Sequence, residues 1–161
     1  MGGKVIRTLR ASPLLASLTE EELGGLASCS RVYMYAPDQV ILAGDGQDER
    51  LFILQHGRVR LRLTMQTEGG QCSGETTRDL TLTGQTFGWG AWVRPEHIIV
   101  SALALEPVSL VACDLTRLKD AETFWKLSQQ MLKDLYGWLQ ESGLCPPNLQ
   151  ALLGLSHLLA A

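Results

Sequence analysis

The sequence predicts a mainly β domain with flanking helices: an antiparallel double-stranded β-helix, or jelly roll, followed by a long C-terminal helix. Between residues 31 and 114, short apolar runs with a period of two alternate with turn residues. Over residues 121–141 the apolar residues return to a helical period. The chain has 161 residues, which is room for one domain with a normal core and a helical appendage.

We expect four segments along the chain. Residues 1–11 are expected to form an N-terminal tail, and residues 12–118 the β domain with a helix at its start. Residues 119–143 are expected to form the long helix, and residues 144–161 a short amphipathic helical tail.

A short helix is expected to begin at Thr19. Thr19 and Glu22 have the spacing of a capping box, and Leu18 and Leu23 have the spacing of a hydrophobic staple. Two glycines in the next turn lower the helix propensity. Packing of Leu23 and Leu26 against the core is therefore expected to hold this helix.

Seven strands are expected after this helix, because each apolar run is bounded by turn residues. They cover residues 32–36, 39–43, 51–55, 58–65, 78–83, 98–105 and 108–114. Strands at this short, regular spacing are typical of a sandwich or a small antiparallel roll. The stretch 66–78 holds Gly69, Gly70 and Gly74 and almost no apolar residue, so we expect a mobile hairpin tip there.

The helix at 121–141 carries apolar residues on two neighbouring faces. The first stripe comprises Phe124, Leu127, Met131, Leu135 and Trp138, and the second comprises Trp125, Leu132, Tyr136 and Leu139. Ser142 and Gly143 are expected to end the helix. A helix that is apolar on two faces usually lies between its own domain and something else.

Composition excludes several classes of protein. The net charge of −3 and the isoelectric point near 5.6 argue against binding nucleic acid through bulk electrostatics. No segment resembles a secretory signal or a membrane span, so we expect a cytosolic protein. Cys29, Cys72, Cys113 and Cys145 are far apart and lack metal-type spacing, so we expect reduced thiols and no metal site. No nucleophile turn, carboxylate pair or phosphate loop is present, so we expect no enzyme.

Taken together, these features resemble the cyclic nucleotide-binding domain family, which includes the sensor domain of the catabolite activator protein and its relatives. The resemblance runs from about Ser12 to Glu141. It is carried by "SPLLASLTEEELGGLA", by "QVILAGDGQDERLFILQHGRVRL" with Gly44, Asp45 and Gly57 at its corners, and by "GQTFGWGAW" with the later "SALALEPVSLVACD". The resemblance implies a β-roll with a long C-terminal helix and a non-catalytic regulatory role.

In the family, the segment after the Phe-Gly pair is the phosphate-binding cassette. Gly84 and Gly88 allow a sharp bend here, and a short helix that opens after the bend would point free N–H groups at an anion. The ligand-binding residues that the resemblance implies are Phe87, Gly88, Trp89, Gly90, Ala91, Trp92, Arg94, His97, Ile98, Ser101 and Ala102. The candidate occupants are a cyclic nucleotide or another small anionic or apolar ligand, and haem is not expected.

The cassette departs from the family pattern at its two polar anchors. The family's Glu, which accepts the ribose hydroxyl, falls on Trp89, and its phosphate-clamping Arg falls on Ile98. Ala91 matches the cassette alanine, and Ser101 matches a Ser or Thr of the following strand. Hydrogen bonds to charged groups contribute about 1.5–3 kcal/mol each, and a guanidinium–phosphate pair makes two. Their loss should lower cyclic-nucleotide affinity by more than about a thousandfold.

Other readings of the cassette stay open. Arg94 or His97 could reach the phosphate from a rearranged cassette. Trp89 and Trp92 could line an apolar pocket or fill it. His97 alone is a weak signal for haem, which some relatives bind through histidine, and a surface histidine is the simpler reading. Iron–sulfur sensing needs clustered cysteines and is rejected.

Three functions therefore remain open for a regulatory domain with lost or altered cyclic-nucleotide binding. They are a sensor of an unconventional ligand, a ligand-free module that docks a protein partner, and the sensory half of a transcription regulator. The stretch after Glu141 is too short for a helix-turn-helix reader, so direct DNA binding is not expected, although a fragment of a longer regulator would look the same. We expect a homodimer through 121–141, with back-folding of the tail after Pro147 as the alternative.

Overall fold

The computed structural model describes residues 2–44, 49–65, 74–89, 98–118 and 120–144. The helices among them are α1 (Gly2–Ala11), α2 (Glu20–Ser28) and α3 (Ala121–Glu141), with 3-10 turns η1 (Pro13–Leu15) and η3 (Leu115–Arg117). The strands are β1 (Ser30–Tyr35), β2 (Val40–Leu42), β3 (Arg50–His56), β4 (Val59–Met65), β5 (Gly74–Leu80), β6 (Thr86–Phe87), β7 (Ile98–Ala104) and β8 (Val108–Asp114).

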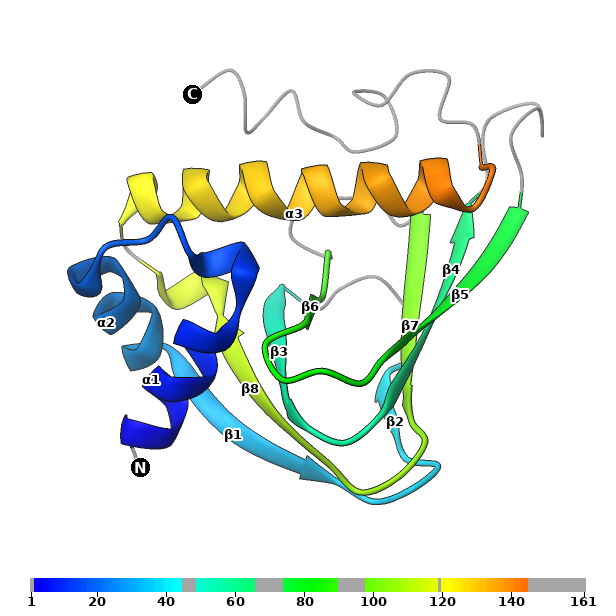
Figure 1. Ribbon diagram of the computed structural model, residues 1–161, viewed down its shortest axis with the longest axis horizontal. Helices are drawn as coiled ribbons and strands as arrows, with labels where there is room; N and C mark the ends of the chain where they lie inside the picture. Colours follow the sequence, from blue (N-terminus) through cyan, green and yellow to red (C-terminus); the bar gives the residue numbers. More distant parts are fainter. Residues whose placement is uncertain (1, 45–48, 66–73, 90–97, 119, 145–161) are drawn as a thin grey trace.

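The strands form two four-stranded antiparallel sheets, with the orders β1-β8-β3-β6 and β2-β7-β4-β5. Sequential strands such as β3 and β4 lie in different sheets, so the chain winds back and forth between two layers (Figure 1). This is the predicted mainly β jelly roll. The long helix α3 runs across one open end of the roll, while α1 and α2 lie beside the sheet that contains β1 and β8 (Figure 1).

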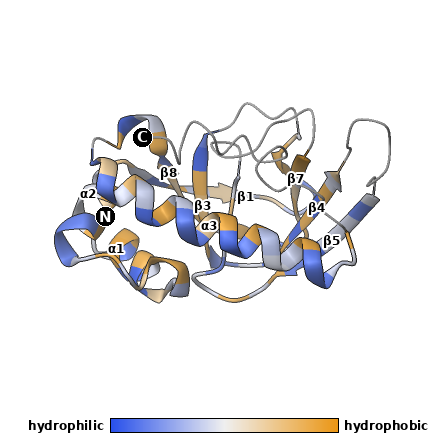
Figure 2. Ribbon diagram, turned by 90° about the horizontal axis from the view of Figure 1, so that it is seen from above, coloured by the Kyte–Doolittle hydropathy of each residue, from blue (hydrophilic) through white to orange (hydrophobic). Residues whose placement is uncertain are grey.

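The core lies between the two sheets because the strands alternate between buried and exposed side chains. Strand β4 is the clearest case: Val59, Leu61, Leu63 and Met65 are fully buried, whereas the arginines between them face solvent. Helix α3 closes the core from the end of the roll, and seen from above it carries hydrophobic and hydrophilic residues in alternating bands (Figure 2). Its first predicted stripe packs inward, with Leu127, Met131, Leu135 and Trp138 all buried and Phe124 partly buried.

The N-terminal segment differs from the sequence analysis, which assigned residues 1–11 to a tail. It forms α1, whose inner face buries Val5, Thr8 and Leu9. The Thr8 hydroxyl accepts a hydrogen bond of 3.1 Å from the Gln55 amide on β3. The buried positions follow the helical period of three and four residues, so a short amphipathic helix anchored on the sheet replaces the tail.

The predicted strands are confirmed with three differences. The strand expected over 78–83 ends at Leu80, because the Thr81 and Leu82 N–H groups donate to the Gln85 side chain in a turn. Residues 74–78 were expected in a hairpin tip, but they form the start of β5, because β4 and β5 pair in continuous register from Val59↔Leu80 to Met65↔Gly74. The prediction missed this part of the strand because its outward residues are polar, and Asp79 binds Arg60 at 2.9 Å across the ladder. The short strand β6 was not predicted. Residues 66–73 lie outside the described part of the chain.

The predicted helix boundaries are confirmed at both ends of the domain. Thr19 and Glu22 form the capping box: the Glu22 N–H donates to the Thr19 hydroxyl at 3.1 Å, and the Thr19 N–H donates to the Glu22 carboxylate at 2.9 Å. Helix α3 ends at Glu141, followed by Gly143 with a φ of 71°. The predicted helical tail, except for its first residue, lies outside the described residues. Among the described residues, no helix is both long enough and apolar enough to cross a bilayer.

The start of α3 is attached to α2 by a largely buried carboxylate. Glu22 accepts a hydrogen bond of 2.8 Å from the Lys126 ammonium, and the Thr123 hydroxyl lies 3.4 Å from its second oxygen. The bond from Lys126 and the backbone bond from Thr19 lower the pKa of Glu22 from 4.5 to about 2. Asp120 caps the same end of α3 by accepting the Glu122 N–H. We call this set of interactions the α2 contact.

Candidate functional site

The cassette segment, residues 87–102, begins in β6. Phe87 pairs with Phe52 of β3, and their rings stack with centroids 4.9 Å apart and planes 9° from parallel. Gly88 follows with a φ of 104°, and a Cβ atom there would lie 2.6 Å from the Arg50 carbonyl oxygen. Both the backbone angle and the close approach require glycine. The chain therefore turns sharply after Phe87, as the sequence analysis expected of this bend.

Trp89, at the position the family resemblance gives to Glu, contacts α3. Its side chain is only 1% exposed. The indole Nε1–H donates a hydrogen bond of 3.0 Å to the backbone carbonyl of Met131. The ring packs on Trp138, with centroids 5.7 Å apart and planes tilted by 43°. Trp89 therefore stands at the position of the family's ribose-binding residue, but its side chain is bonded to α3 and packed against it.

Arg78 of β5 extends this arrangement on the other side of Trp138. Its guanidinium lies 4.6 Å from the Trp138 ring centroid, within the range of a cation–π interaction. It also faces Asp134 at 3.4 Å and Glu141 at 4.0 Å. Burial raises the pKa of Asp134, although the nearby Arg78 acts in the opposite direction. We call the set Trp89, Met131, Trp138 and Arg78 the tryptophan contact.

The far end of the cassette segment lies on β7. Ile98, at the position of the family's Arg, is 1% exposed and pairs with Met65 of β4. Ala102 is also buried, on the same face of the strand. Ser101 lies on the opposite face, where it pairs with Arg62 among the outward residues of β4. The strand therefore does not bring Ser101 to the same side as Ile98 and Ala102.

Five predicted ligand residues lie outside the described part of the chain: Gly90, Ala91, Trp92, Arg94 and His97. The hypotheses that Arg94 or His97 reaches the phosphate, and that His97 is a surface histidine and not a haem ligand, stay predictions. Within the described residues, no group of three or more His, Cys, Asp or Glu side chains could hold a metal ion.

No family model and no curated protein matches the chain. Solved structures do match. A protein from Geobacter metallireducens named as a cyclic nucleotide-binding protein is 26% identical, with a TM-score of 0.56 over 81% of this chain and 92% of that one. A cAMP-bound triple variant of the regulatory subunit of a cAMP-independent protein kinase A from Trypanosoma brucei is 18% identical, with a TM-score of 0.61 over 86% and 47%. The sensor domain of the transcriptional regulator DNR from Pseudomonas aeruginosa is 16% identical, with a TM-score of 0.59 over 83% and 92%.

This chain has the fold of the cyclic nucleotide-binding domains. Its structural neighbours are regulatory or sensor domains. The chain spans about half of the protein kinase A regulatory chains it matches from Toxoplasma gondii and Trypanosoma brucei, at 46% and 47% of their lengths.

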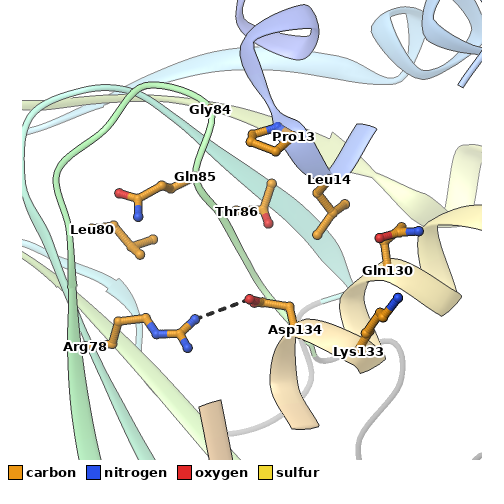
Figure 3. Close-up of a pocket in the computed structure, with 10 residues that line it drawn as sticks. All are labelled: Pro13, Leu14, Arg78, Leu80, Gly84, Gln85, Thr86, Gln130, Lys133 and Asp134. Carbon is orange, nitrogen blue, oxygen red and sulfur yellow. Dashed lines mark hydrogen bonds and ion pairs between the residues drawn. The ribbon is translucent and has the colours of Figure 1, made fainter. Parts of the chain in front are cut away.

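A second candidate site on this cyclic nucleotide-binding fold is a cleft of about 360 Å³ beside α3. It lies between η1, β5, the turn before β6 and α3 (Figure 3). Its walls comprise Pro13, Leu14, Arg78, Leu80, Gly84, Gln85, Thr86, Gln130, Lys133 and Asp134. These residues were not predicted to form a site. They come from four elements, and only the spacing of Gln130, Lys133 and Asp134 on one helix could have indicated a shared polar edge.

Proposed function

We propose that this chain is a non-catalytic regulatory domain in which the cassette does not bind cyclic nucleotides through the family's two polar anchors. The observation that carries the proposal is the placement of Trp89, which is buried and bonded to the Met131 carbonyl of α3. The second anchor position, Ile98, is buried against the β4 strand. The side chains at both anchor positions are therefore packed in the core and offer no polar group to a ligand.

The energetic consequence of two apolar anchors is large. A cyclic phosphate next to Ile98 would lose a bidentate guanidinium partner, and leaving a buried charge without its partner costs about 3–5 kcal/mol. A loss of that size corresponds to a decrease in affinity of roughly 10²- to 10⁴-fold. A ribose hydroxyl next to Trp89 would meet an indole whose only donor is already used.

A solved neighbour gives a precedent for a domain of this fold without cyclic AMP control. The Trypanosoma brucei kinase is described as cAMP-independent, and cyclic AMP is bound in the A site of a variant with three substitutions. One of the three replaces a threonine with arginine. A domain of this fold can therefore serve a kinase that cyclic AMP does not control, and that supports the same reading for this chain.

The test is a calorimetric titration of the purified chain with cyclic AMP and cyclic GMP. We expect no saturable binding by the wild type up to millimolar nucleotide. The variant Trp89→Glu with Ile98→Arg should gain measurable cyclic AMP binding, provided that circular dichroism shows a folded protein. Micromolar binding by the wild type would show that the proposal is wrong, whatever the double variant does.

We also propose that the chain forms a homodimer through the outward stripe of α3. Trp125 is 36% exposed and Tyr136 is 39% exposed, and Leu132 between them is half-buried against the core. Leu139, the fourth residue of the predicted second stripe, is fully buried, which leaves Trp125, Leu132 and Tyr136. The three residues recur at a helical spacing that places them on one side of α3. Large apolar side chains gathered on one exposed face usually mark an interface. The alternative is that a different protein binds the same stripe. The cytosolic location of the chain stays a prediction.

Light scattering coupled to size-exclusion chromatography tests the dimer. The wild type should run at twice the chain mass, and Trp125→Glu with Tyr136→Glu should run as a monomer. Met34→Glu is the matched control, because Met34 is a large apolar residue, 81% exposed, on β1 and away from α3. If the wild type is a monomer at high concentration, the homodimer proposal is wrong and a different protein partner on the stripe is favoured.

A further inference from the structure

The cleft beside α3 has the features of a ligand site, although none of its wall residues belongs to the cassette segment. Its volume of about 360 Å³ lies within the range of small-molecule sites, about 300–1,000 Å³. We propose that this cleft binds a small organic carboxylate with a short apolar chain. The proposal goes beyond the proposed function, because it does not depend on what the cassette binds.

The cleft offers cationic groups for the carboxylate. Arg78 can donate hydrogen bonds to a further carboxylate, because its contacts with Asp134 and Glu141 are long, at 3.4 and 4.0 Å. A strong charge-assisted hydrogen bond measures roughly 2.7–2.9 Å. A guanidinium has five N–H donors, so a carboxylate can bind it without replacing both partners. Lys133 supplies a second cation, and within the described residues no ion pair engages it. The walls therefore carry two cationic side chains, Arg78 and Lys133, and one anionic side chain, Asp134.

The rest of the cleft suits an apolar chain held by polar edges. Pro13, Leu14 and Leu80 supply apolar surface from two elements (Figure 3). The amide oxygen of Gln85 accepts the backbone N–H groups of Thr81 and Leu82, both at 2.8 Å, which fixes that side chain before any ligand arrives. Six of the ten wall residues are polar, so the cleft is more polar than the usual small-molecule pocket and suits a ligand with a charged end.

An occupant of the cleft would contact Arg78, which is one of the residues of the tryptophan contact. Arg78 stacks on Trp138, and Trp138 packs on Trp89, the residue at the start of the cassette segment. A carboxylate bound to Arg78 would change the charge beside that ring. The site is therefore placed to influence the C-terminal half of α3.

The test is an NMR titration of the full chain with hexanoate, and with hexanamide as its neutral counterpart. We expect saturable shifts at the cleft amides with hexanoate, and binding of hexanamide at least about tenfold weaker. Lys133→Gln should weaken hexanoate binding by about three- to tenfold, and Arg78→Gln by more. Arg62→Gln is the matched control, because Arg62 pairs with Glu75 on the outer face of β4 and β5 and should change the affinity less than about twofold.

Two results would overturn the carboxylate site. Equal binding of hexanoate and hexanamide, or no saturable shift with either, would show that the cleft does not select the charge. An equal loss of affinity in Arg62→Gln and Lys133→Gln would show that only general surface charge attracts the probe. Should Arg78→Gln fail to fold because Trp138 loses its partner, Lys133→Gln still decides the matter. Cyclic AMP binding is measured separately, so this site and the cassette proposal can fail independently.

Discussion

The two halves of α3 are attached to the domain by different chemistry. At its start, the α2 contact joins Lys126 to the Glu22 carboxylate at 2.8 Å. Toward its end, the tryptophan contact joins Met131 and Trp138 to Trp89, and Trp138 to Arg78. The first half thus depends on an ion pair to a neighbouring helix, and the second on aromatic packing against the cassette segment and β5.

This difference assigns separate roles to the two halves. The α2 contact joins two helices outside the cassette segment, so a change within residues 87–102 leaves its partners in place. The tryptophan contact includes a cassette residue directly, so a rearrangement that displaces Trp89 has to break or move it. The C-terminal half of α3 is therefore the part that can report on the state of the cassette.

The largest expected effect comes from removing the ring at the centre of the tryptophan contact. Trp138→Ala should lower the free energy of unfolding by about 3–5 kcal/mol, because Trp138 is only 3% exposed and the truncation leaves a cavity. Urea denaturation followed by circular dichroism measures the change. Leu82→Ala is the control, since Leu82 is 66% exposed and should change stability by less than about 0.5 kcal/mol. A small effect for Trp138→Ala would mean that the aromatic packing does not hold the helix.

A smaller effect is expected when the indole N–H is removed and an aromatic ring is kept. Trp89→Phe should cost about 1–2 kcal/mol, because the Met131 carbonyl loses its indole donor and some packing is lost. Hydrogen exchange should show faster exchange in the second half of α3 and little change in the first half. Uniform acceleration along the whole helix would contradict the division into two halves.

The smallest effect is expected from Glu22→Gln, because Gln still satisfies the capping box and only the charge paired with Lys126 is lost. This destabilisation should be present at neutral pH and should disappear in acid. The pKa of Glu22 is lowered from 4.5 to about 2 in the folded protein, so its ionised form stabilises the fold above pH 4.5 and this contribution is lost as the pH falls toward 2. Melting temperatures across this range should therefore fall less steeply for Glu22→Gln than for the wild type. Equal slopes would show that the ion pair with Lys126 contributes nothing to stability.

Local signals in the sequence were sufficient for most of the fold. The capping box at Thr19, the end of α3 before Gly143 and the alternation in β4 each depend on neighbouring residues, and each was predicted. Helix α1 was missed because its few apolar residues lie among glycines and charges. The start of β5 was missed because its polar residues pair with β4.

The sites were harder to predict because their contacts join distant parts of the chain. The sequence indicated that Trp89 replaces a polar anchor, but not that its N–H binds the Met131 carbonyl, 42 residues away. The walls of the cleft come from η1, β5, the turn before β6 and α3, and no periodic pattern connects them. Such sites depend on packing between elements, which a single sequence records only indirectly.

The acceptor in the Trp89 bond is a main-chain oxygen, and this makes the interaction asymmetric under mutation. Every amino acid brings the same carbonyl to position 131, so a change from Met131 to another helix-compatible apolar residue keeps the acceptor where it is. At position 89 the donor belongs to the side chain, so a change to Phe or to an aliphatic residue removes it. The hydrogen bond therefore tolerates substitution at position 131, whereas it is lost when the donor side chain at position 89 is replaced.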